Sequence, residues 1–169
     1  MNHRSVNKIL AKRVSVRSRP PVAEVLQAAL DLFSSKGYEE TKMAEIAGRA
    51  GLSVGALYLR FKGKEELFLE LIKDQTKDQD ELTKKFSQSG EPPISLLKEY
   101  IEFSLEYACG KKQLLSMVMR EHRLPFLQPL RKKYFETQHK IIKGILTAGV
   151  KHGCFRPMSF EDTALMIFA

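Results

Sequence analysis

The segment AGLSVGALYLRFKGKEEL, Ala50–Leu67, has the spacing of a short helix and carries a glycine, Gly55, inside it. Glycine in a helix interior costs on the order of 1 kcal/mol relative to alanine, because it has more backbone freedom to lose on folding. At about 100° per residue, Val54, Leu57 and Phe61 lie on one side and are predicted to pack against neighbouring helices. The opposite side contains Gly55, so the exposed face is small and smooth at its centre.

Two helices are predicted before this segment and a longer one after it. From Pro20 the apolar residues recur at i, i+3, i+4 and i+7, which is typical of an amphipathic helix, and Gly37 is expected to close it. A shorter helix is predicted through TKMAEIAGRAG, with Thr41 as its N-cap. Two short helices joined by a tight turn, the second of them exposed, predict a helix-turn-helix DNA-binding domain over residues 20–66.

The rest of the chain, residues 67–169, is also predicted to be helical. The long helix that begins at KEELFLELI leaves the small domain, and QSGEPP ends it. Helical spacing then continues in ISLLKEYIEFSLEYA, QLLSMVMREHR, PFLQPLRKKYFETQHKIIKGILTAGVKHG and SFEDTALMIFA, and none of these alternates like a strand. The sequence therefore predicts an all-α protein of about eight helices, whose last helical pattern stops at Ala169 as if a final helix were missing.

The positive charge is concentrated near the N-terminus. The net charge is +8, and residues 1–64 contain twelve Lys or Arg against five Asp or Glu, whereas residues 65–169 contain sixteen against fifteen. Residues 1–19 contain no acid, and they are interpreted either as a flexible solvated arm or as an arm that adds contacts to DNA phosphates. No apolar run approaches the roughly 18 residues of a membrane span, so a cytoplasmic protein without a membrane partner is expected.

The exposed side of the segment has the chemistry of a helix that enters the major groove. Such a helix needs small residues where its backbone meets base edges, and donors at its margins where the phosphates pass. Ala56 and Leu59 are expected to contact thymine methyl groups, while a supporting ring and ordinary surface charge remain alternatives for Tyr58 and Lys64. The expected phosphate donors are Ser53, Tyr58, Arg60 and Lys64.

Residues 37–68, GYEETKMAEIAGRAGLSVGALYLRFKGKEELF, closely resemble the DNA-binding signature of the TetR/AcrR family of one-component transcriptional repressors. The skeleton IA..AG.S.G.LY..F..KE.L matches in order and spacing. The resemblance implies a homodimer that binds a palindromic operator in double-stranded DNA and a C-terminal domain whose small-molecule effector moves the two reading heads apart. It implies base-facing positions at Val54, Gly55 and Ala56, and DNA backbone contacts by Thr41, Lys42, Ser53, Tyr58, Arg60 and Lys64.

The resemblance has departures and further implications. Arg60 stands where the family commonly has histidine, which would make its phosphate contact independent of pH, and Leu59 replaces a more usual aromatic or polar residue. Dimerisation through the last two helices is implied, with a face that comprises residues 141–150, Leu165, Met166 and Phe168.

Apolar and aromatic residues of the C-terminal domain are candidates for lining an effector pocket. Plain core packing is the alternative for most of them. Arg120, His122 and Arg123 are interpreted either as contacts for an anionic ligand or as solvated surface. The candidate pocket residues are Tyr100, Phe103, Leu105, Tyr107, Met117, Val118, Phe126 and Tyr134.

An enzyme, a metal site and a cofactor are not expected. The four histidines are scattered, Cys109 and Cys154 stand far apart, and no glycine-rich phosphate loop precedes a strand. The sequence thus favours a ligand-responsive transcriptional regulator, most simply a repressor. A non-specific basic DNA-binding protein without a sensor remains the alternative, and a ligand-binding scaffold that has lost DNA binding would leave the donors around Gly55 unexplained.

Overall fold

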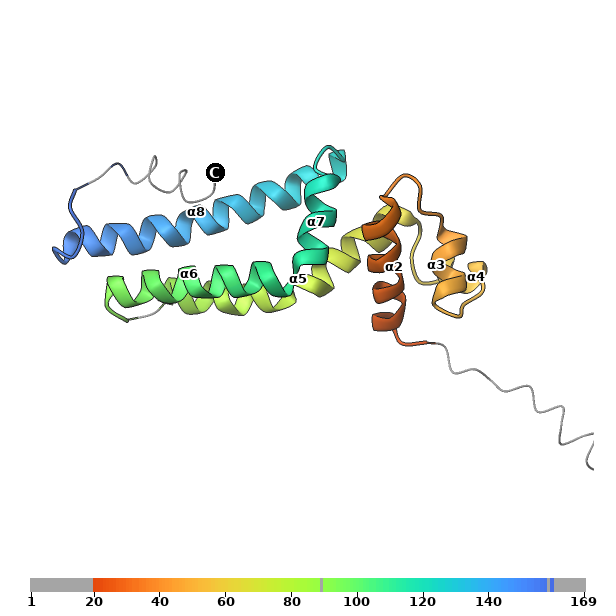
Figure 1. Ribbon diagram of the computed structural model, residues 1–169, viewed down its shortest axis with the longest axis horizontal. Coiled ribbons are helices and arrows are strands. Elements are labelled where there is room, and N and C mark those ends of the chain that lie inside the picture. The colour runs from red at the N-terminus through yellow and green to blue at the C-terminus, as the bar shows by residue number, and fades with distance from the viewer. Residues whose placement is uncertain (1–19, 89, 158, 160–169) are drawn as a thin grey trace, which may run out of the picture.

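The computed structural model describes residues 20–88, 90–157 and 159, and within these ranges it is helical and has no strand (Figure 1). The predicted arm, residues 1–19, and the helix predicted in SFEDTALMIFA, with Leu165, Met166 and Phe168, lie outside the described residues, apart from Ser159. Among the residues described, no helix is both long and apolar enough to cross a membrane. The elements are α2 (Val22–Lys36), α3 (Met43–Arg49), α4 (Val54–Tyr58), α5 (Lys64–Gln88), α6 (Pro93–Gly110), α7 (Lys112–Arg120), the 3₁₀ turn η1 (Pro125–Leu127) and α8 (Gln128–Lys151).

The turns fall where the sequence predicts them. Gly37 ends α2 with φ of 94°, a left-handed conformation that favours glycine, and its N–H donates to Phe33 O at 2.9 Å. Gly51 has φ of 68° in the turn between α3 and α4. The segment QSGEPP separates α5 from α6. The helix-turn-helix and the long connecting helix are therefore confirmed as predicted.

The expected N-cap of α3 is wrong. Thr41 is 1% exposed, and its hydroxyl donates to Gly37 O at 2.7 Å, which holds the loop between α2 and α3 together. Lys42 occupies the N-cap position instead, and its N–H donates to Glu45 Oε2 at 3.1 Å. A carboxylate reaching back from the first turn thus replaces the hydroxyl cap that the sequence suggested.

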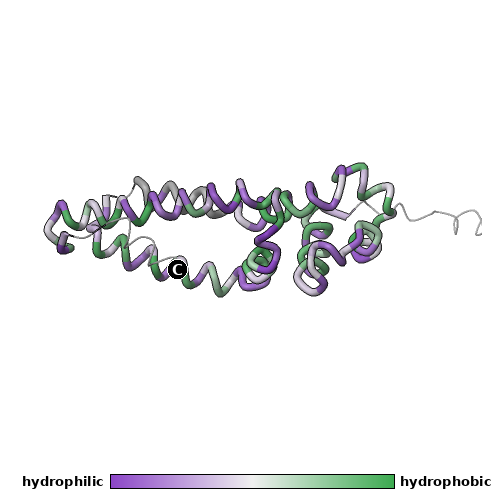
Figure 2. The backbone as a smooth tube through the Cα atoms, turned by 90° about the horizontal axis from the view of Figure 1, so that it is seen from above, coloured by the Kyte–Doolittle hydropathy of each residue, from purple (hydrophilic) through white to green (hydrophobic). Residues whose placement is uncertain are grey.

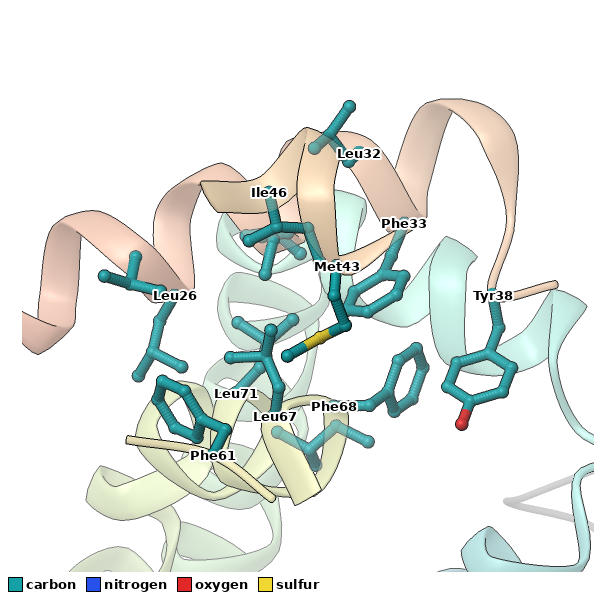
Figure 3. Close-up of a cluster of buried hydrophobic side chains, with 14 of the residues drawn as sticks. Leu26, Leu32, Phe33, Tyr38, Met43, Ile46, Phe61, Leu67, Phe68 and Leu71 are labelled. Carbon is teal, nitrogen blue, oxygen red and sulfur yellow. The ribbon is translucent and has the colours of Figure 1, made fainter. Parts of the chain in front are cut away.

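One hydrophobic cluster, here called the head core, joins α2, α3, α4 and the first turns of α5 (Figure 3). Phe33 and Phe68 meet at its centre with ring centroids 4.9 Å apart. Leu114 and Met117 of α7 belong to the same cluster and are almost fully buried. The head core therefore continues past residue 66 and includes part of the C-terminal half of the chain.

A second cluster, here called the body core, joins the end of α5 to α6 and α8, which run beside one another away from the head (Figures 1 and 2). Inside it the Tyr100 hydroxyl donates to Gln138 Oε1 at 2.8 Å. Burial raises the pKa of Tyr100 to about 12, with a smaller contribution from nearby Tyr134. The body core consists of Phe86, Leu96, Tyr100, Ile141, Ile142, Ile145 and Leu146.

Helix α8 contains part of the predicted dimer face, but its apolar residues are buried within the single chain. Ile141, Ile142, Ile145 and Leu146 are all at most 5% exposed within the single chain. These four apolar residues therefore pack against the chain's own α5 and α6, while Lys143, Gly144 and Thr147 on the other side of α8 are exposed. The apolar periodicity of that stretch reports burial, and it does not distinguish an internal partner from a second subunit.

Candidate DNA-binding surface

The short helix α4 is held by its inner side and presents its outer side to solvent. Leu57 is fully buried and Phe61, just beyond the helix, is 5% exposed, whereas Leu59 is 78% and Tyr58 51% exposed. A Cβ added at Gly55 would have no atom within 4 Å, apart from its own helix and chain neighbours. The protein's own packing thus does not require glycine at this position.

The prediction that Val54 packs against the other helices is wrong. Its side chain is 42% exposed, because it lies in the first residue of α4, where the chain enters from the turn. The base-facing role implied for Val54 needs such exposure. Leu57 and Phe61 alone therefore supply the predicted packing side of this segment.

Ser53 begins α4 as the sequence predicts. Its Oγ accepts a hydrogen bond from Ala56 N–H at 3.2 Å, and the serine itself is exposed. A five-residue helix forms very few internal hydrogen bonds, so this cap and the buried Leu57 together determine where the helix lies. Ser53 can therefore cap α4 and still remain exposed to solvent at the start of that helix.

Three of the expected phosphate donors have partners inside the protein. Lys64 Nζ donates to Tyr38 O at 2.6 Å and Glu39 O at 3.0 Å, and lies 4.4 Å from the centroid of the Tyr38 ring. Arg60 Nη1 donates to Pro20 O at 2.7 Å. The Thr41 hydroxyl is buried and donates to Gly37 O, as described above, so a phosphate contact by that group stays a prediction that this packing does not favour. These partners are backbone atoms of distant segments, which sequence spacing does not reveal.

The remaining predicted residues lie at the start of α3 and along α4, two helices that pack against each other in the head. Lys42 is exposed at the start of α3, and Ala56 is half-buried within α4. Some residues of the predicted DNA site are exposed or half-buried and use no polar side-chain atom inside the protein: Lys42, Val54, Gly55, Ala56, Tyr58 and Leu59. Ser53 is also exposed, and its hydroxyl caps α4.

Ion pairs hold α3 against α2. Lys36 pairs with Glu45, and Arg49 pairs with Asp31 at 2.9 Å. Partial burial tends to raise the pKa of Asp31, but hydrogen bonds from Gln27, Gln113 and Arg49 outweigh it and lower that pKa below its usual value. Both cations thus help to hold α3, the helix that packs against α4, in place.

Helix α7 is anchored to the end of α2, a link that the sequence pattern does not reveal. Arg120 Nη1 donates to Ser34 O at 2.9 Å, and Nη2 donates to Phe33 O. The next residue, Glu121, accepts from Tyr38 N–H at 3.0 Å. The carbonyls at a helix C-terminus attract cations, so Arg120 stabilises the end of α2. The side chain is 44% exposed, so Arg120 does lie at the surface as one of its two interpretations expects. Only its position in the last turn of a helix hinted at its contacts with the carbonyls of α2.

The candidate pocket residues divide into two separate groups. Met117 is 1% exposed in the head core, and the Phe126 ring lies 5.2 Å from the Tyr38 ring, beside that core. Tyr100, Phe103 and Tyr107 follow one another along α6 near Tyr134 of α8. The eight candidate residues therefore do not line a single pocket. The open apolar groove of about 360 Å³ on α6 is lined by other residues, namely Ile94, Leu97, Lys98, Ile101, Glu102 and Phe155.

A buried three-helix core that presents a short, smooth helix to solvent defines a helix-turn-helix DNA-binding protein. Residues 25–71 match the family described as bacterial regulatory proteins, tetR family. The HTH-type transcriptional regulator RutR of Escherichia coli is 35% identical over 165 residues, covering 94% of this chain and 76% of RutR. The chain belongs to the tetR family and is a DNA-binding transcriptional regulator, so the resemblance seen in the sequence is confirmed.

Other similarities extend beyond the head. The fatty acid metabolism regulator protein of Bacillus subtilis is 28% identical over 149 residues, covering 81% of this chain and 72% of that protein. The structure of the TetR family regulator PfmR from Thermus thermophilus superposes with a TM-score of 0.72 at 25% identity, covering 85% of this chain and 80% of that one. With two further Bacillus subtilis regulators the match spans only 39% and 36% of their length.

Proposed function

We propose that the chain represses transcription as a homodimer, that each subunit reads one half of a palindromic operator with α4, and that a small-molecule effector releases it. The observation that carries this proposal is the exposed face of α4, where Gly55 has open space above it and Leu57 anchors the opposite side. Such a face lets the helix backbone approach base edges closely. Two-fold symmetry places the half-sites about 34 Å apart, one helical turn, or a multiple of that distance.

The anchoring of α7 supports a route from effector to DNA. Leu114 and Met117 are packed in the head core, and Arg120 holds the end of α2, so a shift of α7 must move the head with it. At its other end Lys111, which precedes α7, donates to Gln75 of α5 at 3.3 Å. An effector that favours one position of α7 would thereby favour one spacing of the two heads.

The effector is an apolar small molecule bound by the body. Half-buried Phe103 and Tyr107 on α6, with Tyr134 of α8 near Tyr100, supply an aromatic surface for it beside the body core. The similarity to a regulator of fatty acid metabolism supports testing fatty acids first.

The test of operator reading starts from duplexes selected by the full chain out of a random-sequence library. We expect a palindromic consensus, two chains per duplex, and an affinity at least about 10³-fold above that for a random duplex at the same salt concentration. A non-specific basic DNA-binding protein would yield no consensus and almost equal affinities, and that result would overturn the proposal.

The effector is tested on the complex of the full chain with the selected duplex. A series of saturated fatty acids is titrated while fluorescence anisotropy reports the bound DNA, and isothermal calorimetry reports binding to the protein. Release of DNA at the concentration that saturates the protein supports the proposed coupling. Binding of a fatty acid without any change in operator affinity refutes it, and absence of binding refutes this effector class.

A further inference from the structure

A buried glutamine in α8, Gln138, has hydrogen-bond donors that the protein does not use. Its side chain is 8% exposed, and its Oε1 accepts a hydrogen bond from the Tyr100 hydroxyl at 2.8 Å. Within the part of the chain that the structure describes, the amide N–H groups of Gln138 have no acceptor. In the same turn of α8, Nε2 of His139 is also buried and has no hydrogen-bond partner among these residues. Buried polar groups in folded proteins are nearly always paired, so this turn calls for a partner from outside the chain.

The side of α8 that carries Gln138 is open to solvent in the direction of the head. Tyr134 and Phe135 lie one turn before Gln138 on the same side of the helix, yet they are 40% and 45% exposed. On α6, half-buried Phe103 and Tyr107 continue the side that packs against α8. Aromatic side chains therefore line the way from solvent to the buried glutamine.

The surroundings of Gln138 favour an uncharged group. Among the described residues, no Lys, Arg, Asp or Glu forms a hydrogen bond or an ion pair with the side chain of Gln138 or Tyr100. Burial raises the pKa of Tyr100 to about 12, so an anion is disfavoured at this place. A carboxylate that leaves water without a cation beside it loses more than one hydrogen bond returns. A neutral carbonyl oxygen avoids that loss and matches the unused N–H donors.

We propose that Gln138 recognises the effector, and that the effector is an apolar molecule with an uncharged carbonyl group, such as an ester, an amide or a lactone; this inference rests on the effector site proposed above. Tyr100 holds Oε1 of the glutamine, so the amide N–H groups are left for the ligand. The carbonyl oxygen accepts from them, and the apolar part lies against Phe103, Tyr107 and Tyr134. Gln138 thus contacts the effector, and Tyr100 is a positioning residue.

The experiment uses three probes of similar length that differ in charge and in the carbonyl group: decanoic acid, methyl decanoate and decyl methyl ether. Isothermal calorimetry measures their binding to the full chain at pH 8, where a carboxyl group is ionised and an imidazole is neutral. The chains compared are the unchanged chain, Gln138→Met, Tyr100→Phe and a control, Gln128→Met. Gln128 is an exposed glutamine of the same helix. The thermal midpoint of each variant verifies folding.

The unchanged chain and the control should bind the ester at least about tenfold more tightly than either the acid or the ether. In Gln138→Met, ester and ether should bind within about threefold of each other and ether binding should be retained, because methionine has a similar volume and no amide. Tyr100→Phe should reduce the preference for the ester by a smaller factor, since the amide loses only its orientation.

Three results would overturn the inference. The first is an acid that binds as tightly as the ester, and the second is the absence of binding by all three probes. The third is an ester preference that persists in Gln138→Met or, where that chain does not fold, in Tyr100→Phe.

The same probes, added to the complex of the full chain with the selected duplex, separate this inference from the proposed function. Binding with the expected preference for the ester but without release of DNA would leave the inference standing and refute the proposed coupling. Equal binding and equal release of DNA by the acid and the ester would overturn the inference and support the coupling.

Discussion

Replacing Gly55 by alanine should stabilise the protein and weaken its binding to DNA. A methyl group at this position meets nothing within 4 Å apart from its own helix and chain neighbours, so the folded structure accommodates it without strain. Alanine in a helix is favoured over glycine by about 0.5–1 kcal/mol, since it has less backbone freedom to lose on folding. For a chain of 169 residues this corresponds to a rise of roughly 1–4 °C in the thermal midpoint.

The effect on DNA has the opposite sign, because the space above Gly55 is where a base edge would lie. A leucine there, with three more carbon atoms than alanine, should lower operator affinity at least tenfold, about 1.4 kcal/mol, while alanine lowers it less. Gly144 of α8 provides a matched control, because it too is exposed, lies inside a helix and has no atom within 4 Å of an added Cβ. Gly144→Ala should therefore raise stability by a similar amount and leave DNA binding unchanged.

The assay combines differential scanning calorimetry with anisotropy titrations of the selected duplex for the Gly55→Ala, Gly55→Leu and Gly144→Ala chains. A rise in midpoint with reduced affinity at position 55 only is the expected pattern. The reasoning is refuted if Gly55→Leu binds as tightly as the unchanged chain, because glycine would then be merely tolerated. It is also refuted if Gly144→Ala weakens binding equally, because stabilisation itself would then be the cause.

Further substitutions test the contacts that position the head and the body. Ser53→Ala removes the cap of α4 and should cost about 1 kcal/mol in urea unfolding, with Ser53→Asp, which can also cap, restoring stability but not DNA binding. Because the pKa of Asp31 is lowered in the folded chain, its carboxylate stabilises the fold above pH 4 and loses that effect as the pH falls. The difference in thermal midpoint between the unchanged chain and Asp31→Asn should therefore shrink between pH 6 and pH 3. A difference that stays constant with pH would contradict this prediction. Arg120→Gln should lower the urea midpoint by the equivalent of about 1 kcal/mol or less, since the guanidinium is partly exposed, and an unchanged midpoint would mean that its contacts to α2 carry no energy. The raised pKa of Tyr100, about 12, means that its neutral form stabilises the fold fully below pH 10 and less as the pH rises towards 12, so Tyr100→Phe should lose less stability than the unchanged chain over that interval.

The head could be predicted from the sequence because its signals are local. Gly37 and Ser53 act on residues three or four positions away, and the buried side of α4 follows from helical periodicity. The failures have a common physical cause. Arg60, Lys64 and Arg120 donate to backbone carbonyls between 25 and 87 residues away in the chain, and any residue type offers such a carbonyl. A spacing pattern can show that a cation is near a helix end, but not which carbonyl it meets.

The body was predicted less well because periodicity identifies an apolar face and not its partner. The resemblance implies a dimer face that includes residues 141–150, but the apolar residues Ile141, Ile142, Ile145 and Leu146 of that stretch pack inside the chain. Met117 was assigned to a pocket, and it lies in the head core, since α7 crosses to α2 and does not stay with α6 alone. Helical spacing is equally satisfied in either case, so only the tertiary structure separates them.

The position of α7 constrains how an effector could act on DNA binding. Leu114 and Met117 are at most 3% exposed in the same core that supports α4, and Arg120 and Glu121 hold the two sides of Gly37 at the end of α2. Close-packed cores resist internal deformation, so α7 cannot move far without carrying the whole head. An effector that shifts α7 should therefore change the position of the head while leaving the face around α4 intact. Operator affinity of the dimer would fall, but the affinity of one head for a single half-site would not, and a large loss on half-site duplexes would instead indicate that the reading helix itself is displaced.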